Sequence, residues 1–383
     1  MHWNIKDTPL KETTAHLIEC LGVDAVVAQL LAQRGITTFE EARAFFRPHI
    51  GQLHDPFLMQ DMDKAVGRLQ QAIDQKEAVM VYGDYDVDGT TSVSLLTHFL
   101  RSQGLDVTPY IPDRYAEGYG LSKKGIDTAK AANISLMIAL DCGVKAIEQV
   151  AYAKTLGIEL IICDHHTPAD VLPDALAVLD PKRGDCAYPF KELCGCGVGF
   201  KLMQGLLQQQ GKEVNEINAY LDFVAVAIAA DIVPMVGENR ALAFLGLQQL
   251  NTNPRPGLKA LMRDKQTGQI ISDVVFGMAP RINAAGRMKH GLNAVELLLS
   301  ASDEEAKKRA QEVETYNSSR REVEQDITKE ALAQIVANEE ENSAANVVYA
   351  PHWHKGVIGI VASRLIEKYY RPTLVFTKAS EGI

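Results

Sequence analysis

Three aspartates at alternate positions, Asp84, Asp86 and Asp88, are the residues of this chain best suited to chemistry. An apolar run over residues 78–81 precedes them, and Gly89 with three hydroxyl residues follows before a helical pattern begins. This order predicts a strand that ends in a cluster of carboxylate oxygens. Carboxylates this close repel one another unless cations neutralise them, so the cluster indicates a site for divalent metal.

The triple aspartate also resembles the start of a calcium-binding helix–loop–helix loop. That loop requires a bidentate Glu at its twelfth position, and the twelfth residue counted from Asp84 is Leu95. The residues before Asp84 are typical of a strand, not of a helix. A solvated turn without any ligand is the second alternative, and both alternatives lose support when residues further along the chain are considered.

Two later segments supply ligands of the right kind. Asp141 and the run Asp164-His165-His166 each follow an apolar, strand-like run. An isolated Asp at a strand end is more often a helix N-cap, but a His after Asp at another strand end of the same sheet is a good metal ligand. Asp231 ends an apolar helical run, where a buried charge needs a partner that a cation would supply.

The ligand types indicate which metal and which reaction. Mixed carboxylate and imidazole ligands favour Mn²⁺ or Mg²⁺ over zinc, which prefers fewer oxygens and closed tetrahedral sites. Two such ions about 3.5–4 Å apart promote phosphoryl transfer to water, because one lowers the pKa of the attacking water and both stabilise the transition state. The sequence therefore predicts two divalent cations, Mn²⁺ or Mg²⁺, and a phosphoester substrate.

Residues that would hold a phosphate fall in three segments. Residues 280–288 supply arginines, an Asn and a glycine turn, residues 355–364 place glycines near a helix start, and residues 111–120 combine Arg, Tyr and Gly in a loop. A surface salt bridge, a helix packed through small residues and an ordinary surface loop remain open as the respective alternatives. The candidate substrate-binding residues are Arg114, Tyr119, Arg281, Asn283, Arg287, Ser363 and Arg364.

Composition sets the broad class. With 383 residues and 46% hydrophobic content, the chain can form two or three domains with real cores. No stretch has the apolar length of a membrane span, and the N-terminus does not resemble a signal peptide. The six scattered cysteines indicate a reducing, cytoplasmic setting, and Cys194-Gly-Cys196 is better explained by a tight turn than by a metal site. The net charge of −10 neither supports nor excludes nucleic acid, since local charges set the field at a site.

Sequence patterns divide the chain into four parts. Residues 1–75 are expected to form a helical N-terminal arm, and residues 76–235 an α/β catalytic domain with a mainly parallel sheet and helices on both faces. Residues 236–344 are expected to be helical and to contain a long connecting helix. A second α/β domain begins near residue 345 and is expected to be incomplete at residue 383.

The expected sheet places the candidate ligands together. Ligands in such folds gather at the C-terminal ends of strands, and Asp84, Asp86, Asp141 and Asp164 all follow strand ends. The expected strands are residues 78–82, 107–111, 136–140, 160–163 and 176–179, and the helices between them are residues 91–102, 123–132 and 146–156.

These motifs together resemble those of the DHH phosphoesterase superfamily. Residues 34–42, 114–120, 180–201 and 280–287 are further similar to its single-strand-specific exonucleases, so the resemblance covers nearly the whole chain. It implies a monomeric 5′→3′ exonuclease that degrades single-stranded DNA to mononucleotides in recombination and repair, assisted by a helicase and a single-strand-binding protein.

The resemblance also implies a role for each site residue. Asp86 and Asp141, with Asp84, would hold one ion. The other ion would be held by Asp88, His165 and Asp231, and Asp141 would bridge the two. His166 would face the scissile phosphate, as a ligand or as the proton donor to the leaving oxygen.

Two alternatives share the same metal site. One is a DHH enzyme for short substrates, such as an oligoribonuclease, a nucleotide phosphatase or a cyclic-dinucleotide phosphodiesterase; these are typically shorter and lack the insertion around residues 180–201 and the arm. The other is a non-catalytic single-strand-binding scaffold, which usually loses metal ligands, whereas every expected ligand is present here. The sequence ends before the Gly-rich His motif of the family's C-terminal domain and before its oligonucleotide-binding fold.

Overall fold

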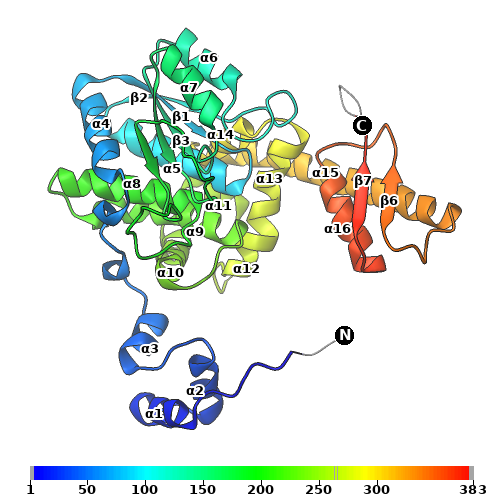
Figure 1. Ribbon diagram of the computed structural model, residues 1–383, viewed down its shortest axis with the longest axis horizontal. Coiled ribbons are helices and arrows are strands. Elements are labelled where there is room, and N and C mark those ends of the chain that lie inside the picture. The colour runs from blue at the N-terminus through cyan, green and yellow to red at the C-terminus, as the bar shows by residue number, and fades with distance from the viewer. Residues whose placement is uncertain (1–3, 263, 265, 379–383) are drawn as a thin grey trace.

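A five-stranded parallel sheet lies at the centre of the larger lobe (Figure 1). The computed structural model describes residues 4–262, 264 and 266–378. The strands follow the order β2-β1-β3-β4-β5, which brings the end of β1 beside the end of β3. Their bounds are β1 Ala78–Gly83, β2 Asp106–Tyr110, β3 Leu136–Leu140, β4 Glu159–Cys163 and β5 Ala177–Leu179.

Helices cover both faces of this sheet because its strands are apolar on both sides. Val79 and Val81 of β1 pack into the larger core, and Met80 and Tyr82 between them pack into a second cluster on the opposite face. The larger core includes α4 Met62–Gln75, α5 Val87–Ser102 and α8 Gly195–Gln209, and the second cluster includes α6 Lys123–Ala131 and α7 Ile147–Thr155.

More helices extend the larger core beyond the sheet. Helix α9 packs against α5 and α10, and α13 packs against the long helix α15. The bounds are η3 Val214–Tyr220, α9 Leu221–Ala230, α10 Gly237–Thr252, α11 Pro256–Leu261, α12 Ile271–Asp273, η4 Val274–Met278, α13 Ala279–Met288 and α14 Leu292–Leu298.

The N-terminal arm is a separate group of short helices below α10 (Figure 1). Its first helices share a small apolar cluster around Leu17, Ala28 and Leu31. The side chains of Thr38 and Glu41 form the expected capping box at the start of α3. The bounds are α1 Lys11–Leu21, α2 Ala25–Ala32, α3 Phe39–Phe46, η1 Ile50–Gln52 and η2 Pro56–Leu58.

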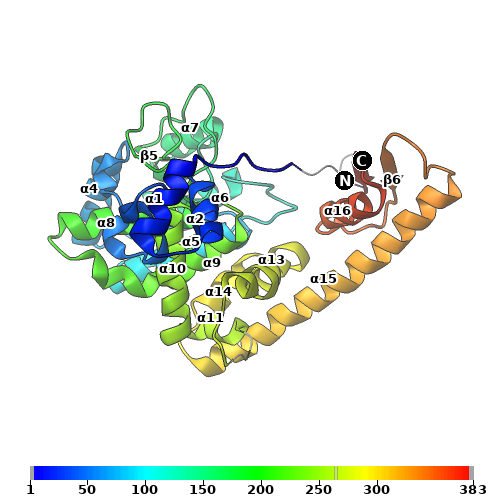
Figure 2. The ribbon, with the colours of Figure 1, turned by 90° about the horizontal axis from the view of Figure 1, so that it is seen from below.

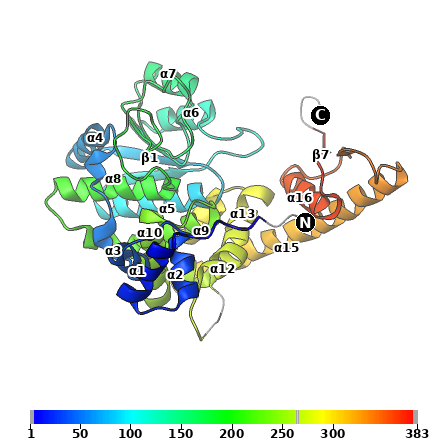
Figure 3. The ribbon, with the colours of Figure 1, turned by 60° about the horizontal axis from the view of Figure 1, so that its bottom comes forward.

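Helix α15 (Asp303–Ala337, 35 residues) joins the larger lobe to a small C-terminal lobe (Figures 2 and 3). The small lobe consists of β6 Asn346–Tyr349, α16 Ile358–Tyr369 and β7 Thr373–Phe376, and its two strands are parallel. Its core, which includes Trp353, Val361 and Leu365, packs against the second half of α15. In the described part of the chain, no single helix is long and apolar enough to cross a membrane; α1 and α2 meet those limits only as a pair, which is bent by 120°.

The α/β class with a mainly parallel sheet is confirmed, and three local predictions are wrong. Helix α5 begins at Val87, not at residue 91, and the hydroxyl residues expected before it lie within its first two turns. The hydroxyls of Thr90, Thr91 and Ser94 donate to carbonyls of the preceding turn, so they fit a buried helix.

The other two errors concern glycine-rich segments that were expected to form turns. Cys194 is the N-cap of α8, so Gly195 and Cys196 belong to the first turn of that helix. Gly286 lies within α13, where a Cβ would approach the Tyr85 carbonyl oxygen to 2.7 Å. Both glycines serve close packing between elements, not a change of chain direction.

Candidate metal centre

The carboxyl ends of neighbouring strands bring the predicted ligands to one edge of the sheet. The Asp141 amide donates to the carbonyl of Cys163 on β4, which holds Asp141 level with the start of the Asp164-His165-His166 run. Asp141 has a φ of 59°, an uncommon left-handed conformation for a residue with a side chain. Asp231 is the C-cap of α9 and approaches the same edge from the helical side.

His165 lies at the centre of the cluster. Its Nε2 atom is 3.1 Å from Asp141 Oδ1, 3.6 Å from Asp231 Oδ2 and 3.8 Å from Asp88 Oδ2. The contact with Asp141 lacks hydrogen-bond geometry, so these atoms face a common space. Two sets of donor atoms lie within 4.8 Å of one another: Asp88, His165 and Asp231, and Asp141, His165 and His166.

Several of these buried atoms have no hydrogen-bond partner among the residues that the structure describes. They are Asp84 Oδ1, Asp141 Oδ1, Asp231 Oδ2 and both ring nitrogens of His165. A buried polar atom without a partner is costly, and several facing one space indicate a missing ligand. Lone pairs on carboxylates and a neutral imidazole are what a divalent cation requires, so the residues fit the predicted ions.

Burial and mutual repulsion of the carboxylates also shift the pKa values in the cluster in a way that favours binding of a cation. Burial, with the nearby Asp86 carboxylate, raises the pKa of Asp84 to about 7. The same causes raise the pKa of Asp231 to about 6 and that of Asp141 well above the ordinary value. Burial lowers the pKa of His165 to about 4, which leaves its imidazole neutral. A bound cation would relieve the repulsion among the carboxylates.

The first turn of α8 fixes Asp88. The backbone amides of Gly195 and Cys196 donate to its two oxygens over 2.6 and 2.7 Å. Gly195 has no room for a side chain, since a Cβ there would lie 2.6 Å from the Cβ of Asp141. The N-terminus of α8 therefore packs directly against two candidate ligands and sets their spacing.

Asp84 and Asp86 lie next to this centre, outside both sets of donor atoms. Asp86 is the N-cap of α5, and one of its oxygens accepts from the Gly89 amide over 3.0 Å. Gly89 is required for this tight turn, since a Cβ there would lie 2.3 Å from the Asp84 carbonyl oxygen. The negative charge of Asp86 contributes to the raised pKa of Asp141, after burial and Asp88, so a cation bound near Asp141 would also be attracted to Asp86.

Asp164 positions His166. Asp164 Oδ1 accepts from Nδ1 of His166 over 2.7 Å, and its other oxygen accepts from the Val144 amide. Burial would raise the pKa of Asp164, but hydrogen bonds from His166 outweigh burial and lower it. The Nε2 atom of His166 contacts the hydroxyl of Tyr119 over 3.1 Å. Sequence reasoning placed Asp164 at the site without a role, although its position one residue before His165 was a usable signal.

Three arginines gather where the two lobes meet. The Arg114 guanidinium lies 4.6 Å from the centre of the Tyr85 ring. Arg287 is half-buried, donates to the carbonyl of Gly356, and has its pKa lowered by burial and then by Arg114 and Arg320. Asn283, Arg287 and Arg320 line a cavity of about 230 Å³ together with Ile232, beside Asp231, and Ile360 of α16. Arg320 was not predicted, because it looked like one of many charges on a solvated helix.

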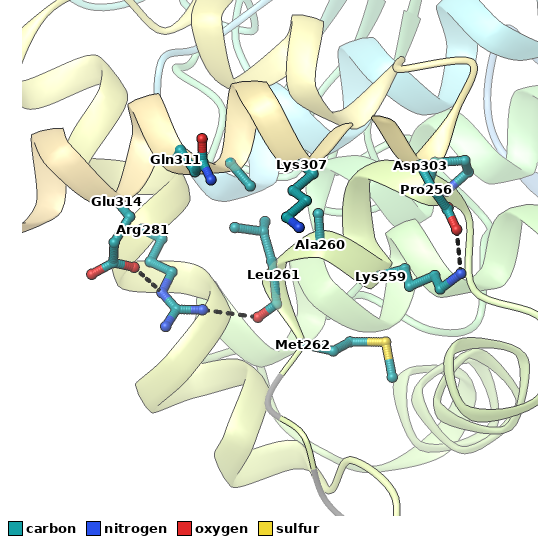
Figure 4. Close-up of a pocket in the computed structure, with 11 residues that line it drawn as sticks. Pro256, Lys259, Ala260, Leu261, Met262, Arg281, Asp303, Lys307, Gln311 and Glu314 are labelled. Carbon is teal, nitrogen blue, oxygen red and sulfur yellow. Dashed lines mark hydrogen bonds and ion pairs between the residues drawn. The ribbon is translucent and has the colours of Figure 1, made fainter. Parts of the chain in front are cut away.

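The remaining predicted phosphate ligands have protein partners elsewhere. Arg281 lies on another side of α13, where it pairs with Glu314 and donates to the Leu261 carbonyl (Figure 4). Arg364 pairs with Glu324 over 2.9 Å, and the exposed Ser363 hydroxyl donates to the Gly359 carbonyl. The structure does not bring Arg281 to the carboxylates, and the salt-bridge alternative describes its contacts.

Comparisons with known proteins identify the family of this chain. Residues 78–228 match the N-terminal domain of the DHH family. The single-stranded-DNA-specific exonuclease RecJ of Bacillus subtilis is 40% identical over 378 residues, which are 98% of this chain and 47% of that protein. The protein of the same name from Escherichia coli K12 is 34% identical, over 93% of this chain and 64% of its own length. The chain thus spans about half to two-thirds of these relatives.

Solved structures share the overall fold. The crystal structure of RecJ from Thermus thermophilus in complex with Mn²⁺ has a TM-score of 0.85 and 29% identity, covering 98% of this chain and 54% of that one. A crystal structure of exonuclease RecJ bound to manganese has a TM-score of 0.76 and 32% identity, covering 86% of this chain and 82% of that one. The protein described here belongs to the RecJ family of DHH proteins.

Proposed function

We propose that this chain carries the catalytic part of a metal-dependent 5′→3′ exonuclease that releases mononucleotides from single-stranded DNA in recombination and repair. The observation that carries the proposal is the convergence of unpartnered carboxylate and imidazole atoms on the space around His165. Relatives that match this chain over most of its length are named as exonucleases specific for single-stranded DNA, and two were solved with Mn²⁺.

The ligands divide into two overlapping sets. Asp88, His165 and Asp231 would hold one Mn²⁺ or Mg²⁺ ion, Asp84 and Asp86 the other, and Asp141 lies where it would serve both. The ions, when bound, would make a water molecule nucleophilic at neutral pH and neutralise charge on the phosphate. T. thermophilus RecJ was also solved with Mg²⁺, which supports the choice of these two metals.

His166 has the properties of a proton donor. Its hydrogen bond to Asp164 raises its pKa and engages Nδ1, so Nε2, which now contacts only the exposed Tyr119 hydroxyl among the described residues, would face a substrate. As water attacks the phosphorus and the phosphorus–oxygen bond breaks, the Nε2 proton of His166 would pass to the leaving oxygen. Asp164 would hold the imidazole in the required orientation throughout.

The arginines would select and hold the substrate. Arg114 and Arg287 would bind the terminal phosphate, with Asn283 at the edge of the same cavity. Tyr119 is exposed beside His166 and would contact a base. Arg281, Ser363 and Arg364 would contact the DNA directly only if they released their present protein partners. We propose that they lie near the bound DNA strand without holding its terminal phosphate.

Setting and partners are also proposals. All six cysteines are free, and five of them are buried, which suits a reducing cytoplasm. We propose a monomer that acts with a helicase and a single-strand-binding protein, because a single-strand exonuclease depends on other proteins to open a duplex.

One assay tests the proposal. The chain would be incubated with 5′-labelled single-stranded DNA, a blunt duplex of the same sequence, RNA and dinucleotides, each with Mn²⁺, Mg²⁺ or chelator. We expect immediate loss of the 5′ label as mononucleotide from the single strand, and little loss from the duplex. Initial release from the 3′ end would refute the polarity, and activity on dinucleotides alone would favour the short-substrate alternative.

A further inference from the structure

A second cavity, lined by none of the candidate metal ligands, lies between the N-terminal arm and the larger lobe. It has a volume of about 590 Å³, within the range of small-molecule sites. Its apolar wall comes from both sides of the junction and includes Ile36, Phe45 and Pro48 of the arm and Met235 and Ala241 of the larger lobe. The segment 34–42, one of the stretches that resemble the exonucleases, forms part of the rim, and the proposed nuclease reaction does not use it.

Three cations line this cavity without acidic partners. Among the described residues, Lys6, Arg34 and Arg240 make no ion pair. Arg34 donates one N–H to the Leu30 carbonyl, and Arg240 donates one to the Phe45 carbonyl while lying 3.6 Å from the centre of the Phe45 ring. Each guanidinium therefore has several N–H groups left for a ligand.

The two arginines are also close enough to repel each other. Burial lowers the pKa of Arg240, and the positive charge of Arg34 lowers it further. The single carboxylate in the lining belongs to Glu41. It accepts hydrogen bonds from the amide and hydroxyl of Thr37 and from the amide of Thr38, so it is occupied in the cap of α3. Three cations against one carboxylate leave an excess of two positive charges, on a chain whose net charge is −10.

We infer that this cavity binds a phosphomonoester with a flat or apolar body, of the size of a nucleoside monophosphate. Such a phosphate carries a charge of about −1.5 to −2 at neutral pH, which matches the excess in the lining, whereas a peptide carboxylate brings only one negative charge. Arginine N–H groups pair with phosphate oxygens, and the apolar wall would cover a base. Nucleoside monophosphates are also products of the proposed reaction, but the inference rests on the cavity and its charges and not on that reaction.

The test measures binding without catalysis. Calorimetric titrations of the full chain with dAMP in chelator would use the wild type, Arg34→Gln, and Arg34→Gln with Arg240→Gln. We expect saturable binding with one dAMP per chain, about tenfold weaker binding for the single variant and further loss for the double variant. Inorganic phosphate should compete, and deoxyadenosine alone should bind weakly.

Two controls separate this cavity from the nuclease site. Arg287→Gln removes an arginine near the metal centre and should leave dAMP binding in chelator unchanged; a loss there would assign the binding to the other site and overturn the inference. Arg43→Gln removes an exposed arginine of the same arm that pairs with Glu40, and it should have no effect. Arg240 also donates a hydrogen bond to the arm, so thermal unfolding would check that the double variant is folded. Arg34→Gln is the decisive variant, because the hydrogen bond that it removes, to the Leu30 carbonyl, is exposed and should matter little for folding.

Binding of dAMP that is unchanged in Arg34→Gln, or no binding by the wild type, would refute the inference. Binding of an acidic peptide in place of dAMP would refute it as well. The outcome is independent of the exonuclease assay: loss of nuclease activity with intact dAMP binding would count against the proposed function alone. Normal nuclease activity of Arg34→Gln with weakened dAMP binding would establish two separate sites.

Discussion

Within the described ranges of the chain, Asp84, Asp141 and Asp231 each have a buried oxygen without a hydrogen-bond partner, whereas Arg281 and Arg364 pair with Glu314 and Glu324. The acidic residues lie at strand and helix ends, which fix them close together despite their repulsion. The two arginines lie on helix surfaces, where long side chains find acidic neighbours. Unpaired charge therefore distinguishes the residues arranged for a ligand from those that stabilise the fold. Arg287 is half-buried and makes no ion pair with a carboxylate in the described part of the chain, so it belongs with the first group.

The largest expected effect follows from removing the charge that both ions would share. Asp141→Asn keeps a side chain that tolerates the left-handed backbone, and it should reduce hydrolysis of single-stranded DNA by about a thousandfold or more, because metal catalysis contributes several kcal/mol. The measurement is turnover with Mn²⁺, together with calorimetric titration of Mn²⁺. Asp174→Asn, at an exposed Asp paired with Lys154, is the control and should behave as the wild type. Near-normal turnover of Asp141→Asn would show that Asp141 is not a shared ligand.

A smaller effect compares two arginines of the same helix. Arg287→Gln should lower kcat/KM on single-stranded DNA by about tenfold to a hundredfold, since it removes a charged hydrogen-bond donor to phosphate. Arg281→Gln should change kcat/KM less than about threefold and cost no more than about 1 kcal/mol of stability, because its ion pair is partly exposed. Equal losses in the two variants would remove the distinction between paired and unpaired arginines.

The smallest effect concerns stability in chelator. The folded-state pKa of Asp84 is about 7 and its ordinary value is 3.8, so the folded chain holds more protons than the unfolded chain between these values. The free energy of unfolding should therefore fall as pH rises from 4 to 7. Asp84→Asn should remove this contribution and be more stable than the wild type at pH 8, on the order of 2 kcal/mol.

Thermal unfolding from pH 4 to pH 8, with and without Mn²⁺, measures the difference in stability between the wild type and Asp84→Asn. The two proteins should have similar stability at pH 4, where Asp84 is protonated in the folded chain. Saturating Mn²⁺ should make the wild type the more stable protein at pH 8, because the ion binds the folded state and the wild type would bind it more tightly. A wild type that is already the more stable protein in chelator at pH 8 would show that Asp84 is satisfied without a cation.

The sequence was sufficient to predict the sheet and to predict that the acidic residues lie close together. Apolar runs with punctuating glycines predicted β1, β3 and β4 to within a residue, and parallel strands place their carboxyl ends together. It was insufficient for helix starts. Gly, Thr and Ser usually indicate a turn, but tertiary packing buried them in the first turns of α5 and α8.

The direction in which side chains point was the other feature that could not be predicted from the sequence. Arg281 and Arg287 lie in one motif, yet residues six apart on a helix point about 120° away from each other, so the two side chains have different surroundings. Arg320 reaches the shared cavity only because α15 passes beside α13, which no local pattern of charges could indicate. The roles of Gly195 and Asp164 depend in the same way on contacts between distant segments.

At Asp141, the residue type that suits the left-handed backbone best differs from the residue type that metal binding requires. An L-residue in this conformation costs roughly 1–2 kcal/mol that glycine would not incur. Glycine at position 141 would relieve both the strain and the electrostatic repulsion, and would also remove the carboxylate that we propose both ions share. The chain tolerates a locally disfavoured residue there, and selection for thermal robustness alone would tend to discard a residue proposed to be needed for hydrolysis.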